Sequence, residues 1–327
     1  MKLRRLRHIA QPVFLLPALL TAALLIFAFK LGNLGEVVGR VKVIPLHILL
    51  YAFAAAVAYL ALKALQLHLL LVNLAVRPAV RPFALAFAVG ELTLTLPFGL
   101  FAQNWILSAS ARVRIGRSAA ATVVMLLAEI LVVLLLMAVV GVRGWPQLRL
   151  AVIAALALFG VVIAGFVVFS QRIHAHVRKV QRPWLRKPLV EAAELLAGLQ
   201  RLSSGRVLSV NLLIAAGYLG ALIAAFFFVG RGMGLHTLGV VTAASVYGFS
   251  LVVVLLGAGA ITQIGTVEVL GMLAAHEWGI DYTNGLALML GFRLVWTGAM
   301  WLLCLPVVVL LWRSIRSERT ADAATRS

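Results

Sequence analysis

The sequence is dominated by apolar runs that are too long and too numerous for a soluble fold. Of its 327 residues, 63% are hydrophobic and only 12% are charged. A soluble domain cannot bury that much apolar surface, because a large share of its residues must face water. Many runs approach ~20 residues, the length of a helix that crosses a bilayer, whereas the strands of a membrane barrel are ~10-residue segments of alternating polarity. The sequence therefore predicts an all-α, polytopic membrane protein with a single integral membrane domain over residues 1–327.

Several segments are expected to cross or enter the membrane. They lie at about 12–30, 45–70, 82–103, 118–141, 149–170, 207–229, 237–256, 264–279 and 285–312. Two regions do not resemble clean crossings, because 82–103 carries Glu91 and a proline-glycine break, while 256–280 is short and rich in glycine. Broken helices persist at membrane depth only where they line a cavity or pack against protein. We therefore predict about seven or eight full crossings and one or two re-entrant or broken helices.

The two breaks occupy similar places in the two halves of the chain, 1–170 and 207–312. Leu96-x-x-Gly99-x-x-x-Gln103 in the first half recurs as Leu256-x-x-Gly259-x-x-x-Gln263 in the second. Interrupted segments at corresponding positions of two halves point to the binding site of a transporter. We therefore expect pseudo-symmetric halves, with hinges or breaks at Pro97, Gly99, Gly257, Gly259 and Gly265.

The basic residues predict topology rather than nucleic-acid binding. The net charge is +19, and Lys and Arg gather at the N-terminus, in 171–206 and in 313–327, without a platform of interleaved aromatic residues. The positive-inside rule places all three regions in the cytoplasm, which gives a protein of the bacterial inner membrane with both termini inside. The first apolar run, up to Phe29, is expected to be a transmembrane helix rather than a cleaved signal peptide.

Residues 171–206 form the largest predicted loop. Its second part, Val190–Leu202, mixes leucines with Glu191, Glu194 and Arg201. This pattern fits an amphipathic helix on the cytoplasmic surface of the membrane or, equally, a solvated connector. The loop is also a candidate surface for a protein partner.

The segment that follows the second break resembles a known family. Gly257-Ala-Gly-Ala-Ile-Thr-Gln-Ile-Gly265-Thr-Val-Glu268, followed by Gly279-Ile280 and Arg293, is similar to the C-terminal signature of the lysylphosphatidylglycerol synthase membrane region, also called the flippase-like family. Upstream, Ser118–Glu129 resembles the family segment that ends in Glu-Arg, although Ile130 replaces the arginine. The sequence looks like a divergent member, near the hopanoid-associated branch. The resemblance implies two facing re-entrant elements and a role in handling lipids.

Four charged residues inside apolar runs are the strongest functional candidates. They are Glu91, Glu129, Glu268 and Arg293. A charge at membrane depth costs about 3 kcal/mol on insertion scales, so each one is a functional candidate by default. The alternative is a structural pairing, of Glu129 or Glu268 with Arg293, that only holds helices together. We predict that Glu268 and Arg293 bind substrate, whereas for Glu91 and Glu129 coupling and structural pairing carry equal weight.

Further polar residues complete the candidate site. The neutral ones at the two breaks are Gln103, Asn104, Thr262 and Gln263. They either line a polar groove for a headgroup or satisfy backbone groups that the breaks leave free. Arg112 and Arg114 are candidates to bind an anionic headgroup, because arginine matches the geometry of phosphate, and their alternative role is to set topology.

No catalytic residue, cofactor or metal is predicted. The sequence contains no phosphate loop, nucleophile elbow or zincin motif. The one cysteine, Cys304, lies in an apolar run, and His174-x-His176 has no cysteine or carboxylate nearby.

The leading functional hypothesis is transport of a lipid or lipid-linked molecule with an anionic headgroup, through a polar groove between the two broken helices. Movement would be downhill, coupled to ions or protons through Glu91, Glu129 or Glu268, or driven by consumption of the product. The main rival is a membrane-embedded transferase that uses Glu268 or Glu129 as a base, although the soluble aminoacyl-transferring domain of bifunctional family members is not expected after Arg313. The third hypothesis is a non-catalytic partner in an envelope-assembly complex that docks through 171–206.

Overall fold

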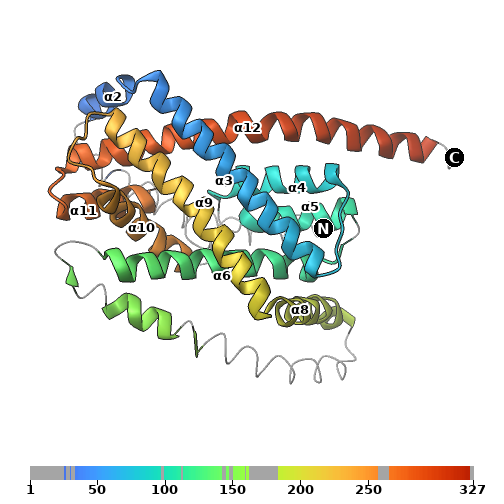
Figure 1. Ribbon diagram of the computed structural model, residues 1–327. Helices are drawn as coiled ribbons and strands as arrows, with labels where there is room; N and C mark the ends of the chain where they lie inside the picture. The colour runs from blue at the N-terminus through green and yellow to red at the C-terminus, as the bar shows by residue number, and fades with distance from the viewer. Residues whose placement is uncertain are drawn as a thin grey trace.

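The computed structural model describes residues 34–96, 99–111, 113–141, 145–146, 150–158, 160–161, 183–256 and 265–324, with the single positions Ile26 and Lys30. Within these ranges the regular structure is entirely helical (Figure 1). The elements are α2 (Leu34–Lys42), α3 (Leu46–Asn73), α4 (Val80–Thr93), the short 3-10 helix η1 (Gly99–Phe101), α5 (Ala102–Ala111), α6 (Ile115–Val140), α8 (Pro183–Leu202), α9 (Gly205–Gly232), α10 (Val240–Leu256), α11 (Thr266–Glu277) and α12 (Tyr282–Ala324).

Four helices are long and apolar enough to cross a bilayer, namely α3, α6, α9 and α12. Their described stretches contain 28, 26, 28 and 31 residues, and about 20 suffice for a crossing. They confirm the helices predicted at 45–70, 118–141, 207–229 and 285–312. Apolar side chains such as Leu50, Leu213 and Leu310 are exposed on their outer faces, as expected where lipid replaces water. The predicted segments 12–30 and 149–170 lie mostly outside the described residues.

The predicted segment 82–103 is broken into two short helices. α4 has 14 residues and α5 has 10, so neither reaches the length of a crossing. The two helices pack against each other, and a Cβ added at Gly90 of α4 would lie 2.9 Å from Gln103 Oε1 of α5. Between them the Thr93 hydroxyl donates hydrogen bonds to the carbonyls of Val89 and Gly99, at 2.7 and 2.8 Å. Thr93 therefore joins the end of α4 to the start of η1, while Pro97 lies outside the described residues.

Short helices also flank the second predicted break. α10 has 17 residues and α11 has 12, and they pack against each other. Trp278, directly after α11, donates a 2.9 Å hydrogen bond from its indole N–H to Ser245 Oγ in the first half of α10. The end of α11 thus lies beside the beginning of α10, so the pair is antiparallel. Gly257 and Gly259 lie outside the described residues, whereas Gly265 has a φ of +85° and leads directly into α11.

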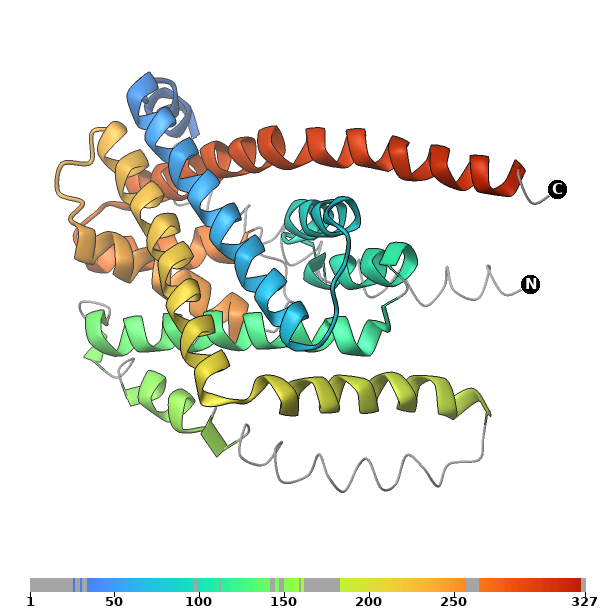
Figure 2. The same ribbon diagram turned by 45° about the vertical axis from the view of Figure 1, so that its right-hand side comes forward.

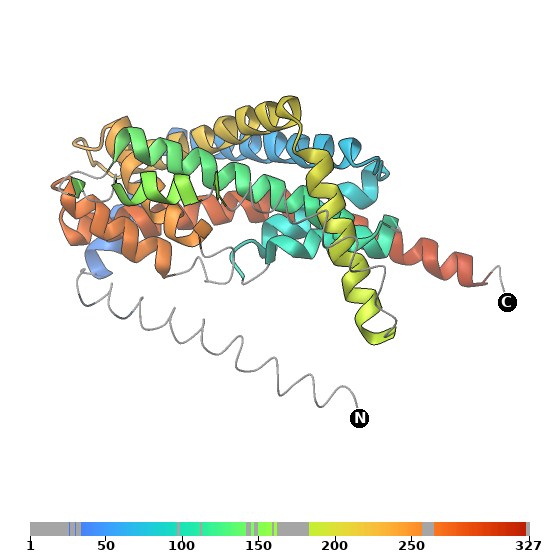
Figure 3. The same cartoon turned by 90° about the horizontal axis from the view of Figure 1, so that it is seen from below.

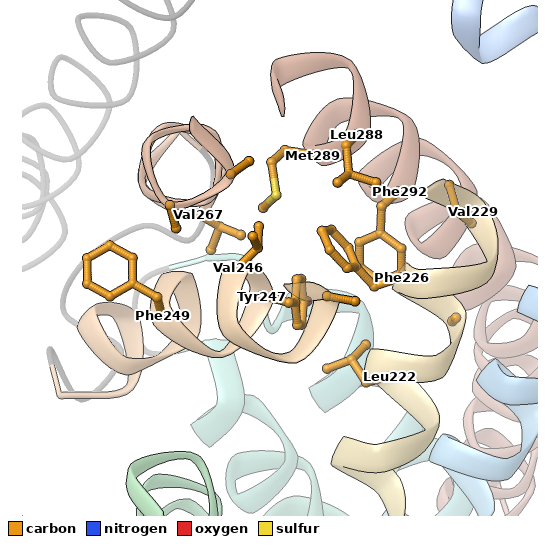
Figure 4. Packing of buried hydrophobic residues seen from close by; sticks show 14 of the residues in the cluster. Leu222, Phe226, Val229, Val246, Tyr247, Phe249, Val267, Leu288, Met289 and Phe292 are labelled. Atoms are coloured by element: carbon orange, nitrogen blue, oxygen red, sulfur yellow. The ribbon is translucent and has the colours of Figure 1, made fainter. Parts of the chain in front are cut away.

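The short helices pack against the long ones in two apolar clusters, with α10 and α11 in one and α4 and α5 in the other. α3 and α9 lie side by side and cross α6 and α12 obliquely, while α10 and α11 pack against α6 and α12 (Figure 2). At the centre, Phe226 of α9, Tyr247 of α10 and Phe292 of α12 contact one another with ring centroids 5.0 to 5.2 Å apart (Figure 4). Such aromatic contacts contribute about 0.5–1.5 kcal/mol each beyond area burial. The cluster therefore fixes α10 and α12 relative to each other.

A buried amide pair joins three of the long helices. Gln66 of α3 donates a 2.6 Å hydrogen bond to Asn211 Oδ1 of α9, and the Asn211 amide donates to the carbonyl of Val124 in α6 at 3.2 Å. Lipid tails are as apolar as the helix surfaces, so helix association in a membrane depends on packing and on such interhelical hydrogen bonds. The pair therefore helps to hold α3, α6 and α9 together.

α8 confirms the helix predicted at Val190–Leu202 and begins earlier, at Pro183. It packs against α6 and projects from the bundle at a large angle (Figure 3). Glu191 accepts a 2.6 Å hydrogen bond from the backbone N–H of Gly116, in the first turn of α6. The N-cap residue of α6, Arg114, makes no such bond with its own side chain. Glu191 thus satisfies a free donor at the helix start and places a negative charge where the helix dipole favours it.

Replacing Gly99 by alanine is expected to destabilise the turn between α4 and α5. A Cβ at this position would lie 1.6 Å from the carbonyl oxygen of Thr93, which is backbone and cannot rotate away. We expect a loss of at least about 1–3 kcal/mol, the usual cost of overpacking, measured as a lower midpoint of thermal unfolding in detergent. The matched control is Gly220→Ala in α9, where nothing lies within 4 Å of the added Cβ. Equal midpoints for the two variants would contradict this account of the turn.

Candidate functional site

A cavity of about 150 Å³ lies at the centre of the bundle, and we call it the central cavity. Most of its wall consists of leucine, valine, methionine and aromatic side chains from α4, η1, α6, α9, α10, α11 and α12. Its tyrosines and charged residues are Tyr59, Lys63, Glu91, Glu129, Tyr218, Tyr247 and Arg293. Apolar walls with a few convergent polar groups are typical of a small-molecule binding site.

Lys63 of α3 is the centre of this polar lining. Its Nζ lies 3.2 Å from Glu91 Oε1 and 3.3 Å from Glu129 Oε1, and it donates a 2.7 Å hydrogen bond to the hydroxyl of Tyr59. These three partners match the three N–H donors of the ammonium group. Tyr218 of α9 donates a further hydrogen bond of 2.8 Å to Glu129 Oε1. We refer to Lys63, Glu91 and Glu129 as the charge triad.

The charge triad is almost completely buried. The side chains of Lys63 and Glu91 are 1% and 2% exposed, and that of Glu129 is 11% exposed. An isolated ammonium at this depth would cost several kcal/mol, and nearby carboxylates offset that cost only if the geometry is good. Because its members come from α3, α4 and α6, the triad ties the short helix α4 to two long helices.

A second ion pair joins α11 to α12. Arg293 of α12 donates from its Nε to Glu268 Oε1 of α11. The other carboxylate oxygen, Oε2, accepts a 2.7 Å hydrogen bond from the backbone N–H of Gly265. Glu268 is the third residue of α11, so this contact satisfies a donor just before the helix. Glu268 therefore fixes the start of α11 and the direction of Arg293 at the same time.

The exposures of these two side chains differ. Glu268 is 2% exposed, whereas Arg293 is 22% exposed and lines the central cavity. The arginine is thus the member of the pair that a molecule in the cavity would contact. The sequence offered Glu129 or Glu268 as the partner of Arg293, and the structure pairs Arg293 with Glu268 and Glu129 with Lys63.

Gln103 and Asn104 of α5 lie away from the lining of the central cavity. Both are 1% exposed and share Thr122 of α6. The Gln103 amide donates to Thr122 Oγ1 at 2.9 Å, and Thr122 Oγ1 donates to Asn104 Oδ1 at 3.0 Å. These side chains therefore join α5 to α6 through Thr122.

Arg114 lies at the outer end of α6, where α8 docks. It forms an ion pair of 2.6 Å with Glu194 of α8, and Arg117 pairs with the same carboxylate at 3.2 Å. Exposed pairs of this kind contribute at most about 1 kcal/mol, so their main effect is to orient α8. Thr262, Gln263 and Arg112 lie outside the described residues.

The functional residue that sequence reasoning missed is Lys63. It lies in the middle of the predicted segment 45–70, so the rule that marked Glu91 and Glu129 as buried charges applies to it equally. Tyr59 and Tyr218 carried no comparable signal, because tyrosine is common in membrane helices. Their hydrogen bonds to the charge triad appear only when α3 and α9 are packed together.

No group of three or more His, Cys, Asp or Glu side chains able to hold a metal ion occurs within the part of the chain that the structure describes. The expectation that the protein uses no metal or cofactor stays a prediction.

The sequence profile of the Lysylphosphatidylglycerol synthase TM region matches residues 14–304, which is most of the chain. The chain belongs to this family. No curated protein matches it. Membership in the Lysylphosphatidylglycerol synthase TM region family confirms the resemblance seen in the signature with Glu268 and Arg293, and it makes the chain a multi-pass membrane protein with a lipid-related function.

The family match covers both charged groups of the site. The charge triad, Glu268 and Arg293 all fall within residues 14–304. In this member of the family the acidic and basic residues of the C-terminal signature are joined by an ion pair, and Glu129, at the end of the upstream segment, is bound by Lys63.

Replacing Lys63 by methionine is expected to destabilise the protein strongly. The substitution leaves Glu91 and Glu129 buried beside each other without their ammonium, and breaking a buried ion pair costs about 3–5 kcal/mol. We expect a correspondingly lower midpoint of thermal unfolding in detergent. The triple variant Lys63→Met/Glu91→Gln/Glu129→Gln is expected to recover most of the loss, because neutral groups of similar size can replace buried charges at little cost.

Tyr218→Phe is the control for the same experiment, since it removes one hydrogen bond to Glu129 and no charge. Its expected cost is about 1.5–3 kcal/mol at most. A triple variant as unstable as Lys63→Met alone would show that charge balance is not what the triad contributes.

Proposed function

We propose that this protein moves a lipid or lipid-linked molecule between the two leaflets of the bacterial inner membrane. The observation that carries the proposal is one central cavity that combines charged residues with apolar walls, enclosed by helices long enough to cross a membrane. A headgroup needs polar partners when it leaves water, because an unpaired polar group in an apolar medium costs several kcal/mol. The acyl or isoprenoid tail needs none and can stay among lipid tails.

In this proposal the pairs α4–α5 and α10–α11 are re-entrant elements that meet at the cavity. Their short lengths and mutual packing support this topology, since interrupted helices at membrane depth line a cavity or pack against protein. Both termini and residues 171–206 then lie in the cytoplasm, in agreement with their basic residues.

Arg293 is the residue best placed to receive an anionic headgroup. It lines the cavity, and its planar guanidinium suits a phosphate group. A phosphate that approached Arg293 would compete with Glu268 for it. Glu268 would retain the hydrogen bond from the N–H of Gly265, so its carboxylate keeps a donor during the exchange. Arg293 thus binds the headgroup, and Glu268 holds Arg293 in place until a headgroup arrives.

The rival function, a transferase with Glu129 or Glu268 as a base, is supported less well. Glu129 Oε1 already accepts from Tyr218 and lies beside Lys63, and both oxygens of Glu268 are hydrogen-bonded. A general base must accept a proton from its substrate, and these oxygens already accept hydrogen bonds from groups within the protein.

The test is leaflet-resolved lipid movement in proteoliposomes. The probes are a fluorescent phosphatidylglycerol, a fluorescent phosphatidylethanolamine and an isoprenyl phosphate, each followed from one leaflet to the other. We expect protein-dependent movement of an anionic probe that Arg293→Ala slows about tenfold or more, since a hydrogen bond to a charged group is worth about 1.5–3 kcal/mol. Glu268→Gln is expected to slow movement as well, because the ion pair that directs Arg293 is lost.

Two exposed positions provide matched controls. Glu36→Gln alters a carboxylate that pairs with Arg40 at the surface, and Arg201→Ala removes an exposed arginine of α8. Both are expected to retain the wild-type rate. Mass spectrometry of the recovered lipids decides between the functions: a new lipid species that depends on the protein supports the transferase. The absence of both movement and product for every probe would contradict the proposal.

A further inference from the structure

The charge triad contains one cation and two anions. Lys63 faces both Glu91 and Glu129, whereas Arg293 and Glu268 match one to one. The other titratable side chains of the described cavity lining are Tyr59, Tyr218 and Tyr247, which are neutral near pH 7. With all carboxylates ionised, this set of buried side chains would carry one net negative charge.

An unbalanced charge at this depth is costly, because the protein interior screens it much less than bulk water does. Two carboxylates that share one site resolve the cost by binding a proton between them, and the proton then belongs to the pair as a unit. Since Glu91 Oε1 and Glu129 Oε1 both lie within 3.3 Å of the same ammonium nitrogen, they form such a pair. One bound proton makes the set neutral.

The surroundings of the two carboxyl groups indicate which of them binds the proton. Glu129 is the more exposed of the two, at 11%, and accepts a hydrogen bond from Tyr218. Glu91 is 2% exposed. The Tyr59 hydroxyl accepts a hydrogen bond from Lys63 and can donate its own proton to Glu91, and Cys304 of α12 is a further titratable group near this carboxyl. We propose that Glu91 is a proton-binding site, which is protonated near neutral pH and has Lys63 and Glu129 as its charged neighbours.

This site would make headgroup binding depend on pH, an extension that rests on the proposed function. At high pH the Glu91 carboxylic acid releases its proton to water in the cavity and becomes a carboxylate. The added negative charge repels an anionic headgroup at Arg293. By linkage, the headgroup and the proton favour each other's binding, so movement of an anionic lipid decreases as the pH rises.

Infrared spectroscopy of the purified protein tests the proton site without any lipid substrate. The carbonyl stretch of a buried, protonated carboxylic acid is separate from that of carboxylates, and the chain has only 10 Asp and Glu residues, so assignment by substitution is practical. We expect this band in the wild type near neutral pH and its loss in Glu91→Gln. We also expect its loss in Glu129→Gln, because Lys63 and Glu91 then balance each other and Glu91 ionises. The control Glu36→Gln is expected to keep the band.

Each possible result of the infrared experiment bears on a different part of the proposal. A wild type without the band, or a Glu91→Gln variant that keeps it, would overturn the assignment to Glu91. A band that survives in Glu129→Gln would overturn charge balance as its cause. None of these results depends on fold loss, since each single Glu→Gln variant leaves Lys63 with one carboxylate.

The transport assay tests whether lipid movement depends on pH through Glu91. With the fluorescent phosphatidylglycerol, the wild-type rate is expected to fall by up to about tenfold per pH unit above the titration of Glu91, the limit for one proton. Glu91→Gln is expected to show a flat pH profile. A wild-type rate that does not change with pH would overturn the linkage. The infrared band without any lipid movement would reject the proposed function and leave the proton site standing.

Discussion

The ammonium group of Lys63 is the interaction on which the rest of the bundle depends. In a membrane no water is available to solvate it, so its three donors must find partners inside the protein. Those partners come from α3 itself, from the short helix α4 and from α6. The short helix α4, which cannot cross the bilayer, is therefore joined to α3 and α6, which are long enough to cross it. It also draws Tyr218 of α9 to the same place, through Glu129. A single buried cation thus sets the arrangement of four helices.

At the second break, before α11, a charged side chain again satisfies groups that water cannot reach. A helix that starts inside the protein has backbone N–H groups without partners, and Glu268 supplies one partner through Gly265. Its other oxygen is then directed at Arg293 of α12. One carboxylate meets both the capping requirement of a short helix and the pairing requirement of a partly buried arginine. The two charged groups of the cavity differ in consequence: Lys63 has its donors occupied and is almost fully buried, whereas Arg293 remains open to the cavity.

In the proposed function, the charge triad and Arg293 have different roles toward a ligand that has a charged headgroup and an apolar tail. The fixed charges of the triad hold the walls in place and set the electrostatic balance. In the proposed function, Arg293 exchanges a protein carboxylate for a headgroup, and the apolar residues around it impose no cost on a lipid tail. In the same proposal, one bound proton changes the net charge of the site and thereby the affinity of the cavity for an anion.

The sequence by itself determined the helical membrane fold, the long helices at 45–70, 118–141, 207–229 and 285–312, the break in 82–103 and the family. Each follows from hydrophobicity, chain length or a local motif, which do not depend on what lies nearby in space. Tertiary structure decided the pairing of charges: Glu129 meets Lys63, not Arg293, and Gln103 and Asn104 turn to Thr122. Hydropathy marks a residue as buried but carries no information on which helix faces it. That choice depends on helix rotation and packing, which only the folded bundle fixes.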